Sequence, residues 1–261
     1  MPTATLGVSF KAALLAGLVA ALLVAGIHFV VTEPVIEQAI TLEEMHNQAM
    51  GMPEEDPVVS RDLQRGGLFV GFLIYGLTFS LLLGGVFYLV QRRLPGDTLW
   101  IRGMVLCALA YWSLSLLPFL KYPANPPAVG DPETISYRQS LYLGMLLLNV
   151  LGAALAVWLG SRRGWTIGLI TLAVYSVVVY LVLPGNPDAV TIPEELLLAF
   201  RGRSLLGLTL FWGLVAAIFG HMLNRYEQGV RARQAEAGGP AARTTTANDS
   251  LPIGEISASS L

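Results

Sequence analysis

Apolar residues in this chain are gathered in long blocks, and polar residues interrupt them only at intervals. A helix needs about 20 mostly apolar residues to cross the hydrocarbon core of a bilayer. The blocks that meet this length predict spans over residues 10–31, 67–90, 99–120, 141–160, 165–183 and 204–223. The pattern therefore predicts an all-α fold: a polytopic membrane helical bundle of six transmembrane helices.

Composition strengthens this interpretation. The chain has 261 residues, of which 54% are hydrophobic and 13% are charged, whereas about 25% of residues are charged in a soluble domain. A net charge of −2 gives no basic field for phosphates, so we expect a lipid bilayer around the chain and no nucleic-acid partner. Residues 1–227 are expected to form one membrane domain. Residues 228–261, rich in Ala, Gly, Thr and Ser, predict a disordered cytoplasmic tail.

Basic residues predict the orientation. If the N-terminus lies inside, the pairs Arg92-Arg93 and Arg162-Arg163 fall in short inner loops, where positive charge favours the cytoplasmic side. Both termini are then cytoplasmic. The first block is longer than the apolar region of a typical signal peptide, so we expect a retained helix. Most acidic residues fall in the outer loops, where they would attract cations.

The outer loops resemble one another. Residues 123–129 (PANPPAV) return as residues 184–190 (PGNPDAV), and each of the three outer loops has a Pro-Glu pair followed by an arginine. We interpret the chain as three helix–loop–helix repeats. The Pro-Glu pair would begin a short helix on the membrane, and the arginine would pair with a carboxylate or reach lipid headgroups. The repeat-equivalent candidates are Glu54, Arg61, Asn186, Glu194 and Arg201.

The first outer loop contains the candidate metal ligands Met45, His46, Met50 and Met52. Imidazole and carboxylate groups suit cobalt or nickel, and thioethers suit copper(I). His28, near the outer end of the first block, could pass a cation from this loop toward the bundle. In the alternative interpretation, the methionines pack on the membrane surface and His28 is an interfacial residue that a carbonyl satisfies.

Inside the predicted spans, polar groups are few. Asn149 is the only amide near a bilayer centre, and it either ties two helices together or contacts an ion. Glycines at four-residue spacing, Gly67/Gly71 and Gly164/Gly168, predict close helix approach. No Asp or Glu lies in any predicted span, which argues against a self-sufficient ion-coupled pump. The motifs HExxH, CxxC, GxSxG and the P-loop are missing, so we expect neither an enzyme nor a tightly bound cofactor.

Residues 117–135 (LPFLKYPANPPAVGDPETI), with an arginine three positions later, resemble CbtA, a family of predicted cobalt transporter subunits. The resemblance implies a bacterial inner-membrane protein that takes part in cobalt uptake for cobalamin synthesis. It also implies a small partner, CbtB, with one span and a histidine-rich end. The residues that match the motif, and are site candidates for that reason, are Lys121, Tyr122, Asn125, Asp131, Glu133 and Arg138.

Two hypotheses result. In the first, the chain is the membrane subunit of a transporter for cobalt or a related divalent metal, and the metal is the transported substrate. The acidic outer loops would gather cations, and the proline-rich loop would shape the entrance. In the second, the chain is a non-transporting scaffold that assembles with a small partner protein. Asn149 and the small-residue helix faces would then serve packing alone.

Overall fold

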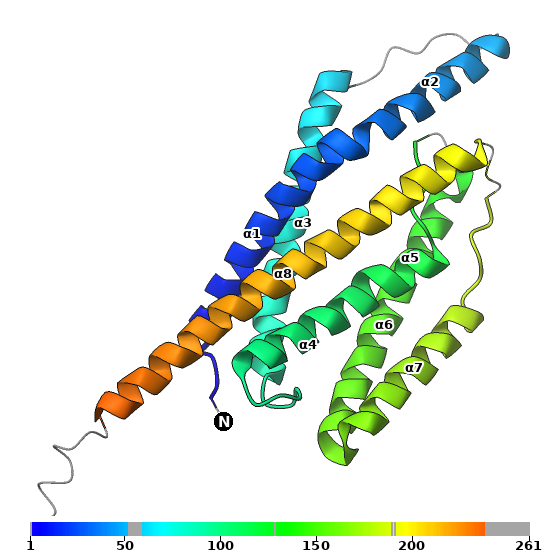
Figure 1. Cartoon of the computed structure of the whole chain (residues 1–261). Helices are drawn as coiled ribbons and strands as arrows, with labels where there is room; N and C mark the ends of the chain where they lie inside the picture. The colour runs from blue at the N-terminus through cyan, green and yellow to red at the C-terminus, as the bar shows by residue number, and fades with distance from the viewer. Residues whose placement is uncertain (1, 52–58, 128, 189, 191, 238–261) are drawn as a thin grey trace, which may run out of the picture.

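Long helices build the molecule (Figure 1). The computed structural model describes residues 2–51, 59–127, 129–188, 190 and 192–237. In chain order the elements are α1 (Leu6–Val31), α2 (Glu33–Ala49), α3 (Arg61–Val90), α4 (Leu99–Tyr111), the π-helix η1 (Trp112–Leu116), α5 (Leu117–Lys121), the 3₁₀ helix η2 (Pro132–Thr134), α6 (Ile135–Arg163), α7 (Trp165–Val182) and α8 (Glu194–Ala237). Within these described residues there is no strand.

Six helical rods are long and apolar enough to cross a membrane, so the prediction of an all-α six-span bundle is confirmed. The third rod joins α4, η1 and α5 end to end. Several helices run past the apolar blocks, because polar residues at a membrane surface can stay helical. α2 continues outward from α1, and α8 reaches Ala237. The predicted start of the tail was therefore wrong: residues 228–237 are helical, and residues 238–261 lie outside the described part.

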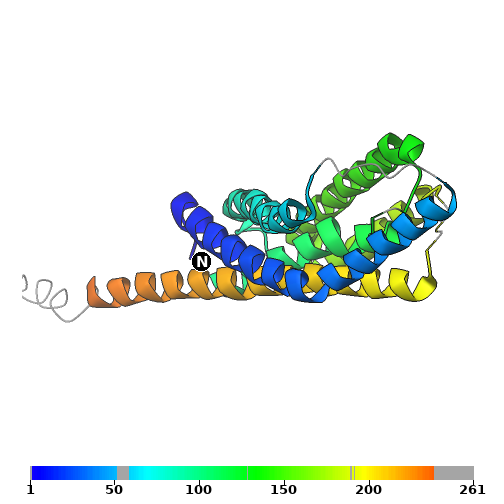
Figure 2. The same cartoon turned by 90° about the horizontal axis from the view of Figure 1, so that it is seen from above.

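α8 connects the helices of the main group. α1 packs on α3 and on α8, and α4 also packs on α8. Figure 2 shows α8 running along one face of the molecule with α1 beside it. α6 and α7 pack on each other and contact the rest mainly through η1 and α5. The bundle therefore consists of a body, made of α1, α3, α4 and α8, and a helix pair attached at its middle.

Small residues set the closest helix approach. A Cβ placed on Gly17 would lie 1.6 Å from the Ser80 hydroxyl oxygen and 2.6 Å from the Gly76 carbonyl oxygen, so α1 and α3 touch there. The two glycine pairs predicted from sequence have different surroundings. Gly168 packs on α6, with the Ala156 carbonyl oxygen 2.8 Å from its Cβ position, but Gly67 faces open space. Four-residue spacing predicts a small face without saying what covers it.

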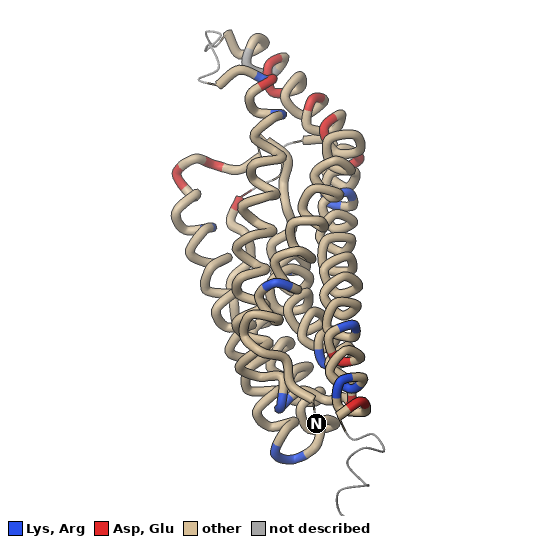
Figure 3. Tube along the Cα trace, turned by 90° about the vertical axis from the view of Figure 1, so that its left-hand side faces the viewer, with Lys and Arg blue, Asp and Glu red and all other residues tan. Residues whose placement is uncertain are grey.

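The sequence repeat does not become three equivalent hairpins. α1 and α3 form a packed pair around the first outer loop, but α7 packs on α6 and α8 packs on α1 and α4. The similarity of the loops therefore does not extend to the packing of their helices. Figure 3 shows that most acidic residues lie toward the end of the molecule away from the N-terminus, where the sequence places the loops expected outside. We call this end the outer end and the opposite one the inner end.

Candidate functional site

Asp188 holds two outer loops together. One is the loop between α5 and η2, which carries the CbtA-like motif (the motif loop), and the other is the loop between α7 and α8. The Arg138 Nε atom lies 2.9 Å from Asp188 Oδ2, and the Asp188 side chain is only 4% exposed. Thr134 Oγ1 donates to Asp188 Oδ1 at 2.7 Å, and the Asp131 amide donates to Asp188 Oδ2 at 3.2 Å. One buried carboxylate thus fixes both loops. Sequence reasoning missed it, although it stands where the other copy of the repeat has Pro127.

The other two repeat arginines also bind neighbouring segments. Arg61 Nη2 lies 2.7 Å from Glu33 Oε1 and 3.1 Å from Glu37 Oε2, which ties α3 to α2. Arg201 Nη2 donates to Asn125 Oδ1 at 2.8 Å, which ties α8 to the motif loop. The hydrogen bond from Arg61, together with its charge, lowers the pKa of the Glu37 carboxyl. All three arginines therefore hold the outer end together, two of them through carboxylates, which is one of the two roles that the sequence suggests.

The remaining motif residues make local contacts. Lys121 Nζ lies 4.9 Å from the centre of the Tyr180 ring, in cation–π contact. The Tyr122 hydroxyl donates to the Pro184 carbonyl oxygen at 2.7 Å, and burial raises the pKa of this phenol. Asn186 Oδ1 accepts from the amide two residues later at 3.1 Å. These contacts shape the two loops and connect α5 with α7.

Two of the Pro-Glu pairs begin helices, as predicted. Pro132 and Glu133 open η2, whose N-cap Asp131 accepts from the Glu133 amide at 2.9 Å. Glu194 begins α8 and places a carboxylate in its first turn, where the negative charge interacts favourably with the helix dipole. Both helices lead directly into a span rather than lying on the membrane. Glu54 lies outside the described residues.

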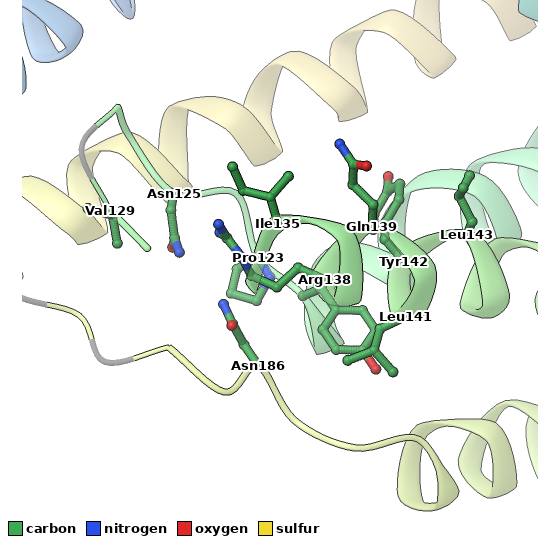
Figure 4. A pocket seen from close by; sticks show the side chains of 11 residues that line it. Pro123, Asn125, Val129, Ile135, Arg138, Gln139, Leu141, Tyr142, Leu143 and Asn186 are labelled. Carbon is green, nitrogen blue, oxygen red and sulfur yellow. The ribbon is translucent and has the colours of Figure 1, made fainter. Parts of the chain in front are cut away.

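A cavity of about 610 Å³ lies under the motif loop, and its lining includes Tyr122, Asn125, Arg138, Tyr142 and Asn186. Figure 4 shows Asn125, Arg138 and Asn186 around the same space, although they come from three segments of the chain. The structure thus brings together four of the residues that sequence reasoning had marked, Tyr122 among them. The exposed Glu133 does not line this cavity.

His28 lines a second outer cavity of about 650 Å³ between α1, α3, α6 and α8. Its Nδ1 atom is in hydrogen-bond contact with Thr32 Oγ1 at 2.7 Å, and its ring stacks on Phe72 with centroids 5.2 Å apart. A Cβ on Gly207 would lie 1.8 Å from His28 Nε2, so only glycine leaves room for this ring. A hydroxyl rather than the expected carbonyl thus holds the imidazole, which is well oriented.

The first-loop ligands are placed only in part. Met45 lies on α2 and lines a groove of about 790 Å³ between α2 and α8. Met50 follows the end of α2 and is exposed. The His46 side chain and Met52 lie outside the described part, so their convergence stays a prediction. Among the residues that are described, no group of three or more His, Cys, Asp or Glu side chains could hold a metal ion.

A polar layer crosses the middle of the third span, at η1. Trp212 Nε1 donates to Ser115 Oγ at 2.8 Å, and Trp112 Nε1 donates to Ser176 Oγ at 2.9 Å. Asn149 Nδ2 donates to a backbone carbonyl of η1 at 3.3 Å. Asn149 therefore ties α6 to η1, as one of the two alternatives predicted. The π-helix itself has no signal in the sequence, because its residues are ordinary members of an apolar block.

The polar layer separates two cavities. Ser115 lines the 650 Å³ outer cavity. Ser113, on the same π-turn, lines a cavity of about 250 Å³ between α3, α4 and α6, together with Trp212. Apolar side chains that line this inner cavity, such as Leu82 and Val150, are exposed. The inner cavity therefore opens on the outside of the bundle between α3 and α6.

These features define a polytopic α-helical membrane protein with outer loops locked by ion pairs and cavities on both sides of a polar layer. The family described as probable cobalt transporter subunit (CbtA) matches residues 10–224, and the chain belongs to this family. No curated protein and no solved structure matches the chain. The family is a transporter subunit, which implies a transported metal ion and a partner subunit. It thereby confirms the resemblance seen in residues 117–135.

Proposed function

We propose that this chain is the membrane subunit of a bacterial inner-membrane uptake system for cobalt or a related divalent metal, which supplies cobalamin synthesis. Both termini would lie in the cytoplasm. The observation that carries the proposal is the outer cavity with His28, in a chain of the CbtA family. An imidazole suits borderline divalent ions such as cobalt, and histidine is the commonest metal ligand in proteins.

The route begins at the acidic outer end. Carboxylates there raise the local concentration of cations. If the Nδ1 proton of His28 is donated to Thr32, the free lone pair lies on Nε2. Nε2 faces Gly207 of α8, so the ring would turn toward the cavity to bind a metal. A second group that holds the other ring nitrogen orients a metal-binding histidine in this manner. His28 would then be the first ligand that an incoming metal meets inside the bundle.

We also propose that the partner is a small single-span protein with a histidine-rich end, as the family resemblance suggests. It would supply metal ligands that the described part of this chain does not group together. The cleft between α3 and α6 offers a place for its span, because exposed apolar side chains such as Leu82, Val86 and Val150 line it. A helix packed there would cover the inner cavity.

The test is uptake of radioactive cobalt into proteoliposomes, with and without the small partner. We expect saturable uptake, and we expect His28→Ala to weaken the apparent affinity by about tenfold or more. His221→Ala is the matched control, because His221 is an exposed histidine near the inner end of the last span. Equal effects of the two substitutions would remove His28 from the route.

The scaffold remains the second candidate, and one observation favours it. The motif residues Arg138 and Asn125 are engaged in contacts that hold loops together, and Asn149 ties two helices. Such residues could serve assembly alone. If the reconstituted protein shows no cobalt flux, alone or with its partner, under any ion gradient, the scaffold replaces the transporter.

A further inference from the structure

Two buried oxygen atoms at the middle of the bundle have no hydrogen-bond partner among the described residues. They are Ser113 Oγ and Asn149 Oδ1. Ser113 is 2% exposed and Asn149 is 3% exposed. Buried polar atoms in folded proteins are nearly always paired, and an exception calls for an unseen water or ion. Two such atoms on neighbouring helices therefore indicate an occupant.

The two oxygens belong to one place in the fold. Asn149 Nδ2 donates to the Ser113 carbonyl oxygen at 3.3 Å, which sets the amide against the π-turn. This bond also fixes which end of the amide is oxygen, because a carbonyl cannot donate to another carbonyl. Ser113 lies within η1, and π-turns inside α-helices occur frequently at functional sites. The two unpaired oxygens thus belong to side chains that meet at the π-turn.

The surrounding hydrogen bonds select the charge of the occupant. The indole N–H groups of Trp112 and Trp212 each donate to a serine hydroxyl, and Asn149 donates to the π-turn. With both indole N–H groups and one N–H of Asn149 engaged, the unpaired atoms are the two oxygens Ser113 Oγ and Asn149 Oδ1, which present lone pairs. The Ser113 hydroxyl can also turn its proton away from an ion. The site therefore suits a cation and disfavours an anion.

The ligands also select the size of the charge. No Asp or Glu occurs in residues 99–120 or 141–160, so the ligands are neutral. The penalty for taking an ion out of water grows with the square of its charge, and neutral ligands compensate a single charge far better than a double one. Membrane transporters coordinate Na⁺ with backbone carbonyls at interrupted helices. Transition metals such as cobalt prefer nitrogen or sulfur ligands over this set.

We propose that η1 and α6 form a binding site for a monovalent alkali cation, of the Na⁺ type, with Ser113 Oγ and Asn149 Oδ1 as ligands. The site lies at the polar layer between the outer and inner cavities. The proposal deepens the proposed function, because such an ion would let a cation gradient drive metal uptake without a carboxylate in the membrane. Its binding step does not depend on that function.

The test is binding of radioactive sodium to the full-length protein in detergent, by scintillation proximity. We expect saturable binding that potassium or lithium competes for and that cobalt does not displace. Ser113→Ala and Asn149→Leu should each weaken it by about tenfold or more, the loss of one good ligand. Ser161→Ala is the control: this exposed hydroxyl of α6 donates to a carbonyl of its own helix turn.

The proposal is overturned if the protein binds no sodium saturably, if cobalt displaces it, or if both site variants bind as well as the control. Ser113→Ala removes a hydroxyl without a hydrogen bond and keeps the test decisive should Asn149→Leu fail to fold. Cobalt uptake separates the two proposals. Sodium binding without any cobalt flux would refute the proposed function alone, whereas cobalt flux without sodium binding would refute the cation site alone.

Discussion

The contacts of Asp188 with Arg138, Thr134 and Asp131, which hold two outer loops together, give the sharpest prediction for stability. Arg138→Gln leaves the Asp188 carboxylate 4% exposed and without its cation, while Arg138 itself is 26% exposed. Removing one partner of a fully buried ion pair costs about 3–5 kcal/mol. Because Arg138 is partly solvated and Asp188 keeps its hydrogen bonds from Thr134 and the Asp131 amide, we expect a smaller loss, about 2–3 kcal/mol.

The assay is unfolding in mixed detergent micelles with rising dodecyl sulfate, followed by far-ultraviolet circular dichroism. Asp188→Asn removes the charge but keeps an acceptor for Thr134, and the double variant with Arg138→Gln completes a thermodynamic cycle. We expect a coupling free energy of about 1–3 kcal/mol. Glu133→Gln, an exposed carboxylate in the same loop, should change stability by less than about 0.5 kcal/mol.

The reasoning is refuted if Arg138→Gln destabilises the protein no more than Glu133→Gln, or if the cycle shows no coupling. A second readout is limited proteolysis of the loop around Asp188. Loss of the Arg138–Asp188 ion pair should speed cleavage of this loop before the spans unfold, because loops open at a lower free energy than packed helices. Unchanged cleavage in Asp188→Asn would also contradict a loop held by this carboxylate.

Three further predictions concern the helices. Gly17→Leu should destabilise the protein by about 1–3 kcal/mol in the same unfolding assay, because its Cβ would lie 1.6 Å from the Ser80 hydroxyl oxygen of α3. Gly26→Leu is the control and should leave stability unchanged, because no atom lies near its Cβ position. The lowered pKa of Glu37 means that its ion pair stabilises the α2–α3 contact above the ordinary value of 4.5 and that this stabilisation is lost as the pH falls through the lowered pKa. Spin-label distances between α2 and α3 should therefore lengthen in acid, and Glu37→Gln should reduce that pH dependence. Gly207→Ala should displace His28 and weaken cobalt uptake about tenfold; unchanged uptake would separate the cavity from the route.

The spans could be predicted from sequence because a bilayer leaves little choice. Every backbone group must be paired inside the hydrocarbon core, so a long apolar block becomes a helix. Segments outside the hydrocarbon core are not constrained in this manner. The start of the tail was wrong for residues 228–237 because a polar helix at a surface needs no apolar block. There Arg231 pairs with the buried Glu227 one turn earlier, which supports the helix beyond the membrane.

The site could be predicted only where the chemistry is local. The turns that open at Pro132 and near Glu194 result from proline and a carboxylate in the first helical turn. Asp188 could not be found in this way, since its partners Arg138, Thr134 and Asp131 lie 50 or more residues away along the chain. The sequence repeat failed to predict the packing of the helices for the same reason. Similar loops reflect the same turn chemistry, whereas helix pairing depends on which faces are small and which are covered.

The polar layer lies where the helix pair α6 and α7 meets the rest of the bundle. α6 and α7 contact the body of the bundle mainly through η1 and α5, and the hydrogen bonds from Asn149 and Trp112 run across that junction. A sequence shows an amide and serines in apolar blocks, but not that a π-turn gathers them where two groups of helices meet. Because polar contacts in a bilayer core have no water to replace them, this junction is where substitutions of single oxygens will report on both assembly and ion binding.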